Sequence, residues 1–188
     1  PIRLKDRAFL DVIAESFNNP IRLWLGWYAL MPATNLAMPP ISITMAWWFF
    51  GALLMTGKRY SEYRFIDDVD LSGRYRKSFQ VYTERKLIIA MITYANLFCF
   101  CTGIAMASYP QIENLVLVFP MIVIAVIAYF NFAMSEVGAK LEPEKLLQNK
   151  WIILSTAITG IAAAWLLYAQ QHDIFSARDA LKLMQGRW

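Results

Sequence analysis

The fold of this chain is decided by two stretches of its sequence, LIIAMITYANLFCFCTGIAMASY (Leu87 to Tyr109) and LVLVFPMIVIAVIAYFNFAMSEV (Leu115 to Val137). Each is as long as the roughly 20 apolar residues with which an α-helix crosses a bilayer. Neither alternates apolar with polar residues, as a strand of a membrane β-barrel would. The two stretches therefore predict membrane-spanning helices.

Three further apolar runs extend this pattern: Ala8 to Met31, Ile41 to Thr56 and Trp151 to Ala169. The first contains several polar residues and the second is short, so we expect both to pack against neighbouring helices. The prediction is an all-α membrane bundle with five transmembrane helices over residues 1–170. Residues 171–188 are expected to form a short amphipathic helix at the membrane interface.

The composition supports a membrane protein. Of the 188 residues, 58% are apolar and 17% are charged, and the mean hydropathy is +0.39. These values exclude a disordered chain, a collagen and a disulfide scaffold. The one histidine, His172, follows the last apolar run. Histidine ligation of haem or chlorophyll inside the bilayer is therefore not expected.

Basic residues lie in alternate loops of the predicted bundle. They precede the first run, follow the second and precede the fifth: Arg3, Lys5, Arg7, Lys58, Arg59, Arg64, Arg74, Arg76, Lys77, Arg85, Lys86, Lys140, Lys145 and Lys150. The other loops, Pro32 to Pro40 and Pro110 to Asn114, contain none. Lysine and arginine favour the cytoplasmic side, so we expect a cytoplasmic N-terminus in a bacterial inner membrane. The net charge of +4 then reflects topology and contact with membrane lipid, and no nucleic-acid partner is expected.

Polar residues recur along the first run at spacings of three or four, namely Asp11, Glu15, Asn18 or Asn19, and Arg22. Such spacings place side chains on one face of a helix. Charges inside a membrane face a polar cavity or a partner, so Asp11, Glu15 and Arg22 are predicted to share one intramembrane polar face. That face could be a functional site or an ion pair that only fixes packing.

A second cluster, GKRYSEYR, begins at Gly57 directly after the second run. If the helix continues, Lys58 and Glu62 form an i, i+4 pair, while Arg59 points elsewhere. Acidic and basic residues follow in the same loop: Asp67, Asp68, Asp70, Arg74, Arg76 and Lys77. Carboxylates beside basic residues could hold Mg²⁺ and a diphosphate. The alternative is a loop of solvated charges that only sets the topology.

These segments resemble the UbiA-type polyprenyltransferase superfamily, specifically its decaprenyl-phosphate phosphoribosyltransferase branch. Gly57-Lys58-Arg59-Tyr60-Ser61-Glu62 looks like the Gly-Lys-Arg-x-x-Glu motif of that branch. Weaker similarities are found at Leu10 to Val12, Asn19 to Gly26, Tyr75 to Thr83 and Glu142 to Leu147. The resemblance extends to about Tyr168 and matches the last five of the nine helices of such an enzyme.

The resemblance implies roles for two sets of residues. Lys58, Arg59 and Glu62 would be catalytic, and Arg74, Arg76 and Lys77 would bind the phosphate of the substrate. The superfamily's Asn-Asp-x-x-Asp motif, which holds Mg²⁺ and the diphosphate, belongs to the first four helices and does not occur in these 188 residues. We therefore expect Mg²⁺ only with a partner half, assign no metal ligands within the chain, and expect no catalysis by this chain alone.

Two hypotheses from different classes follow. In the first, the chain is half of a membrane transferase that acts on a polyprenyl phosphate with a phosphoribosyl or prenyl donor. In the second, it is a non-catalytic structural subunit of a larger assembly, packed against other membrane protein chains. The residues favour the first hypothesis, and the length favours the second.

The charge asymmetry predicts the sidedness of two loops. Ser72 is expected on the cytoplasmic side and Asn35 on the opposite side, because the loop around Asn35 has no lysine or arginine. A cysteine introduced at each position should react with an impermeant thiol reagent from its own side only. Labelling from the opposite side at either position would contradict the five-span topology.

Overall fold

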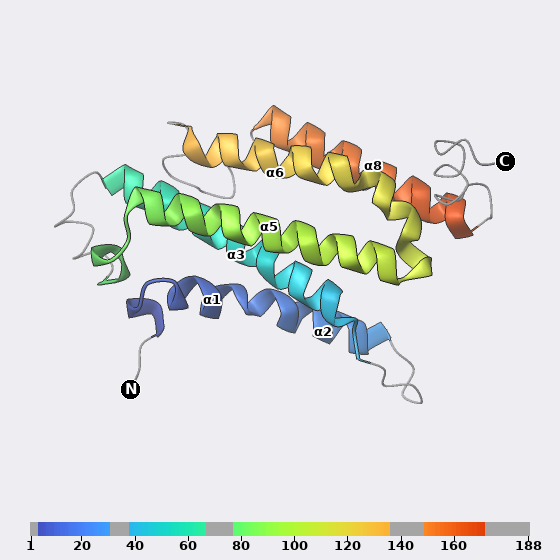
Figure 1. Cartoon of the computed structure of the whole chain (residues 1–188), viewed down its shortest axis with the longest axis horizontal. Helices are drawn as coiled ribbons and strands as arrows, with labels where there is room; N and C mark the ends of the chain where they lie inside the picture. Colours follow the sequence, from blue (N-terminus) through green and yellow to red (C-terminus); the bar gives the residue numbers. More distant parts are fainter. Residues whose placement is uncertain (1–3, 31–37, 67–76, 136–148, 172–188) are drawn as a thin grey trace.

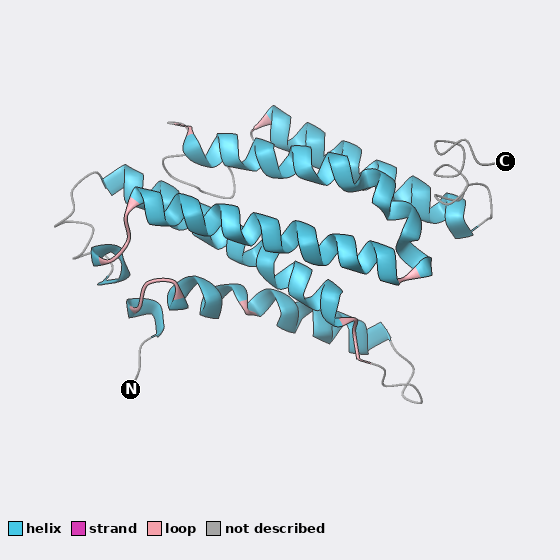
Figure 2. Cartoon of the chain, viewed as in Figure 1, coloured by secondary structure: helices cyan, strands magenta, loops and turns pink. Residues whose placement is uncertain are grey.

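The computed structural model describes residues 4–30, 38–66, 77–135 and 149–171. Helices joined by short connections make up this part of the chain, and no strand occurs in it (Figure 2). The all-α prediction is therefore confirmed for these residues. The predicted interfacial helix, residues 171–188, lies outside them except for the last residue of the preceding helix.

The described elements follow the predicted runs closely. In chain order they are η1 (Leu4–Asp6), α1 (Leu10–Ser16), α2 (Asn18–Leu30), α3 (Ile41–Ile66), η2 (Lys77–Gln80), α5 (Glu84–Ser108), η3 (Pro110–Val118), α6 (Phe119–Met134) and α8 (Lys150–Gln171). Here η marks a 3₁₀-helix. The long run that begins at Leu115 is thus divided into a 3₁₀ segment and an α-helix, with Pro120 in the first turn of α6, where proline is tolerated.

The first predicted span is broken at Phe17 into α1 and α2. Pro20 explains the break, because its ring nitrogen cannot donate to the carbonyl of Ser16, four residues earlier. Side chains take up carbonyls near the break. The Asn18 amide donates to the backbone oxygen of Glu15 at 3.1 Å. The two helices nevertheless continue in nearly the same direction (Figure 1).

Helix α3 is the centre of the bundle. It packs along α5, contacts α1 and α2 on one side, and contacts α6 on the other. Figure 1 shows α1 and α2 end to end below α3 and α5, with α6 and α8 above them. Helix α3 continues ten residues past the predicted Thr56, because its last turns carry residues that are buried against α1 and α5.

Three stretches of the described residues are long and apolar enough to cross a membrane: Glu84–Ser108, Ile112–Met134 and Lys150–Gln170. Their large apolar side chains point outward in many places, as with Phe100, which is 66% exposed, and Ile161, which is 71% exposed. Burial of such side chains in lipid removes them from water. The fold is that of an integral membrane protein.

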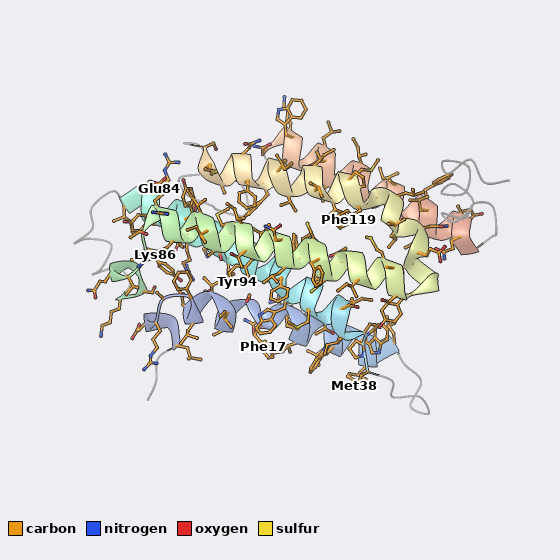
Figure 3. All side chains as sticks on the ribbon, in the orientation of Figure 1. Phe17, Met38, Glu84, Lys86, Tyr94 and Phe119 are labelled. Atoms are coloured by element: carbon orange, nitrogen blue, oxygen red, sulfur yellow. The ribbon has the colours of Figure 1, made fainter. Side chains whose placement is uncertain are left out.

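The buried core lies toward the end of the bundle where α3 ends and α5 begins. Its members come from α3, from η2 and the residues that follow it, from the start of α5 and from the end of α6: Leu53, Tyr60, Phe79, Tyr82, Leu87, Met91, Tyr129, Phe132 and Ala133. Figure 3 shows Glu84 and Lys86 at this end and Met38 toward the opposite end. The segments around the core also carry Asp11 and Glu15 in α1 and Arg59 and Glu62 in α3.

Gly57 of α3 packs directly against Tyr129 of α6. A Cβ atom at Gly57 would lie 2.1 Å from the hydroxyl of Tyr129, and that hydroxyl donates to the backbone oxygen of Leu54 at 2.9 Å. Tyr129 is buried and cannot move away easily, so the close packing of these two helices requires glycine.

We expect Gly57→Ala to destabilise the bundle by roughly 1–3 kcal/mol, as overpacking does in other cores. Gly103→Ala is the matched control, because no atom lies within 4 Å of the added Cβ, and alanine there should be neutral or should stabilise α5 by up to about 1 kcal/mol. Thermal unfolding in one detergent, followed by circular dichroism, compares the two variants. Equal melting temperatures would show that Tyr129 does not restrict this position.

Candidate functional site

The candidate site is built around Arg59, whose side chain is only 2% exposed. Its guanidinium meets three carboxylates. Nε lies 3.3 Å from Oδ2 of Asp11, Nη1 donates to Oε2 of Glu62 at 2.7 Å, and Nη2 donates to Oε2 of Glu15. We call these four residues the Arg59 cluster. It joins α3 to α1, since Asp11 and Glu15 belong to α1.

Asp11 has further partners in the segment that precedes α5. Its side chain is fully buried, and its Oδ1 accepts a hydrogen bond of 2.5 Å from the hydroxyl of Tyr82. The hydroxyl of Ser78 donates to Oδ2 at 3.4 Å. Burial, followed by the Asp11 carboxylate, raises the pKa of Tyr82. Tyr82 therefore remains a protonated donor at neutral pH.

Phe9 controls how the chain enters α1. Its φ angle is +66°, a conformation that bulky residues rarely adopt and that costs of order 1–3 kcal/mol. Its backbone N–H donates to the Tyr82 hydroxyl at 2.8 Å, and the two rings meet edge to face at 5.2 Å. These contacts offset the strain. They also fix the start of the helix that carries Asp11.

The charge balance of the cluster is negative, because one guanidinium faces three carboxylates. The side chains of Glu15 and Glu62 are 38% and 19% exposed. The excess negative charge of the cluster therefore lies toward the surface. An incoming phosphate would meet these carboxylates before it reached the guanidinium. The cluster as folded does not attract anions.

The same carboxylates do not fit Mg²⁺. All three are directed at the Arg59 guanidinium, so a divalent cation at these oxygens would lie beside a like charge. Within the described ranges, no group of three or more His, Cys, Asp or Glu residues is arranged to hold a metal ion. The aspartates predicted to assist, Asp67, Asp68 and Asp70, lie outside those ranges.

A second set of contacts joins α3 to α5 and α6 at the end of the bundle that is predicted to be cytoplasmic. Arg64 donates to the backbone oxygen of Met134 at 2.7 Å, and its guanidinium lies 5.8 Å from the centre of the Tyr60 ring. The Tyr60 hydroxyl in turn donates to Glu84 at 2.9 Å. Arg64 therefore satisfies a carbonyl at the end of α6 and links α3 to α6, whereas Tyr60 links α3 to α5.

The structure places the predicted catalytic residues in different surroundings. Arg59 and Glu62 are in the cluster, whereas Lys58 is exposed. The expected i, i+4 pair of Lys58 and Glu62 is replaced by an i, i+3 pair of Arg59 and Glu62. Lys77, one of the three predicted phosphate ligands, is exposed on η2. Arg74 and Arg76 lie outside the described residues.

The predicted intramembrane face is divided. Asp11 and Glu15 share a partner, but that partner is Arg59 and not Arg22. The reason is geometric: Pro20 is buried, and a residue two positions away on a helix points to nearly the opposite side. Arg22 is exposed. Local spacing alone was a poor guide here because the helix breaks between Glu15 and Arg22.

Sequence reasoning missed Tyr82, Ser78 and Phe9 as parts of the site. Tyr82 is 71 residues from its partner Asp11, and no local pattern announces a contact at that separation. One signal was present: a buried aspartate requires hydrogen-bond donors, so a search for donors near the membrane surface would have included the tyrosine before α5.

An apolar cavity of about 410 Å³ lies elsewhere in the bundle, between α3, α5, α6 and α8. Its lining includes Phe50, Phe98, Val126, Tyr129 and Thr156. None of the residues singled out in the sequence lines it.

Comparison with known proteins gave no match to a family model, to a curated protein or to a solved structure.

Removal of the positive charge of Arg59 should strongly destabilise the bundle. We expect Arg59→Leu to lower the free energy of unfolding by about 3–5 kcal/mol, because Asp11 would remain buried without its positive partner. Lys58→Leu is the matched control, and as an exposed neighbour it should change stability by no more than about 0.5 kcal/mol. Chemical denaturation in mixed micelles measures both. If the two variants unfold alike, the cluster does not hold the bundle together.

Proposed function

We propose that this chain is a non-catalytic structural subunit of a membrane protein complex, built like the C-terminal half of a UbiA-type polyprenyltransferase. The proposal rests on the burial of Arg59 and on its pairing with carboxylates. The arginine of the Gly-Lys-Arg-x-x-Glu segment is buried and held by three carboxylates of its own chain.

A phosphate-binding arginine needs open donors, because its two parallel N–H groups form a fork on phosphate oxygens. In Arg59 both terminal nitrogens donate to glutamates, and Nε faces Asp11. Release of this side chain would leave Asp11 buried without its cation, which is strongly unfavourable. Arg59 is therefore better suited to hold helices together than to exchange between substrate and protein.

The proposed subunit spans the membrane five times with its N-terminus in the cytoplasm. Besides the three apolar candidates, α3 packs along α5, and the α1–α2 segment packs along α3 (Figure 1). These segments therefore occupy the same depth as a candidate span. The end of α3 and the start of α5 bring Arg64 and Lys86 to one end of the bundle. That arrangement agrees with the positive-inside rule.

The transferase half remains the second candidate, and one observation favours it. Lys58 and Lys77 are both exposed, and both belong to segments that surround the Arg59 cluster. Lysine binds phosphate as a point charge. With a partner half that supplies Mg²⁺, these two lysines could hold a polyprenyl phosphate at the membrane surface.

Protein purified in mild detergent together with the chains that bind it separates the two candidates, because a transferase half needs its partner half. The assay follows magnesium-dependent transfer from phosphoribosyl diphosphate to a polyprenyl phosphate, and native mass is measured on the same preparation. We expect no transfer by the wild-type complex or by the complex of Lys58→Ala, and a native mass well above that of one chain. Transfer that is lost in Lys58→Ala but kept in Lys150→Ala would overturn the structural proposal.

A further inference from the structure

The outward side of α2 carries a charge that the bundle does not neutralise. Arg22 is exposed, and among the described residues it has no ion-pair partner. The segment that follows α2, MPATNLA over residues 31–37, contains no acidic residue. Asn18 and Gly26 lie one helical turn before and after Arg22, and both are exposed. We call Asn18, Arg22 and Gly26 the α2 outer face.

Contacts on the opposite side of α2 fix this orientation. Pro20 is buried, and the indole of Trp24 donates to the hydroxyl of Thr44 on α3 at 3.2 Å. Arg22 lies between these two residues in sequence, and its side chain therefore leaves the helix on the side away from α3. The bundle itself thus directs the guanidinium outward.

The depth of Arg22 follows from helix packing. Asn19 packs against Gly51 of α3 so closely that a Cβ at Gly51 would clash with it. Next to Gly51, Phe50 contacts Phe98 with ring centres 5.2 Å apart, and Phe98 is near the middle of α5, a candidate span. Arg22 is three residues beyond Asn19, which is about 4.5 Å along the helix axis. The charge is therefore close to the middle of the bilayer.

A guanidinium at this depth is not stable against lipid chains, and charged residues of membrane helices pair with an opposite charge or face a polar cavity. We infer that the α2 outer face binds a membrane-spanning helix of another protein chain, and that this helix presents an aspartate or glutamate opposite Arg22. Gly26 supports a helix as the occupant. No atom lies within 4 Å of the position that its Cβ would take, so a second backbone can approach closely there.

A second copy of this chain is a poorer occupant. Two copies that cross the membrane in the same direction and meet through this face would be related by a two-fold axis. That symmetry places Arg22 beside Arg22 at the same depth, where like charges repel. The inference rests on the proposed function, in which α5 crosses the membrane and the chain belongs to a complex.

The direct test uses a synthetic probe helix. A 23-residue leucine-alanine peptide with one central aspartate, labelled with an acceptor dye, is added to the donor-labelled protein in phosphatidylcholine vesicles. A peptide with leucine at that position is the reference. We expect the aspartate peptide to associate about tenfold more tightly with the wild type, in line with the strength of polar contacts between membrane helices.

Two variants show whether the preference depends on Arg22. Arg22→Leu should remove it, and unchanged thermal melting of this variant would show that the bundle still folds. Lys150→Leu removes an exposed charge at the end of α8 and should keep the preference. Equal binding of the two peptides by the wild type, or a preference that survives Arg22→Leu, would overturn the inference.

Crosslinking in the native membrane identifies the natural occupant. A photoreactive residue at Gly26 should form a discrete adduct with another chain, mapped to a membrane helix with an acidic residue near mid-depth, and Arg22→Leu should reduce this adduct about tenfold. The same residue at Ile161, also exposed, is the control.

Adducts with lipid only, as for an arginine that reaches the interface, or with a second copy of the chain would overturn the inference. The native mass shows which proposal has failed. A large complex in which Gly26 crosslinks only to lipid contradicts the inference about the α2 outer face alone. A native mass of one chain contradicts the proposed function as a structural subunit.

Discussion

The bundle depends on one buried guanidinium and the carboxylates around it. Arg59 connects α3 to α1 through Asp11 and Glu15, and Asp11 connects both helices to the segment before α5 through Tyr82. Arg59, Asp11 and Tyr82 are each only 2% exposed, and only their partners offset the cost of burying these polar groups. Loss of one partner therefore affects three segments that are far apart in the sequence.

This arrangement changes how the Gly-Lys-Arg-x-x-Glu segment is understood. On a helix, adjacent residues point about 100° apart, so Lys58 and Arg59 cannot both face the same ligand. Helix α3 resolves this by exposing Lys58 and burying Arg59. Glu62, one turn later, pairs with Arg59 and is partly buried. A segment that suggests a phosphate site in sequence thus becomes a joint between helices, and the proposal of a structural subunit follows from that.

The contrast between two arginines separates the inside of the bundle from its partner-facing side. Arg59 is 2% exposed and has three anionic partners, whereas Arg22 lies on the outside of α2, near the depth of the middle of the candidate span α5. In water an exposed arginine needs no explanation. In a membrane the same exposure demands a partner, and this is why we propose the surface of α2 as the place where the subunit meets its complex.

The sequence by itself determined the helical class, the membrane character and most helix bounds. The run predicted from Leu87 to Tyr109 became α5, Glu84–Ser108, because length and hydropathy are local properties that the chain carries in any fold. Only the tertiary structure decided which cation meets Asp11 and Glu15. Local spacing pointed to Arg22, but Pro20 broke the helix and turned Arg22 outward, and packing brought in Arg59, which is 44 residues from Glu15. Contacts between residues so far apart in the sequence depend on how whole helices pack together. That packing depends on all buried surfaces at once, so no short stretch of sequence determines these contacts.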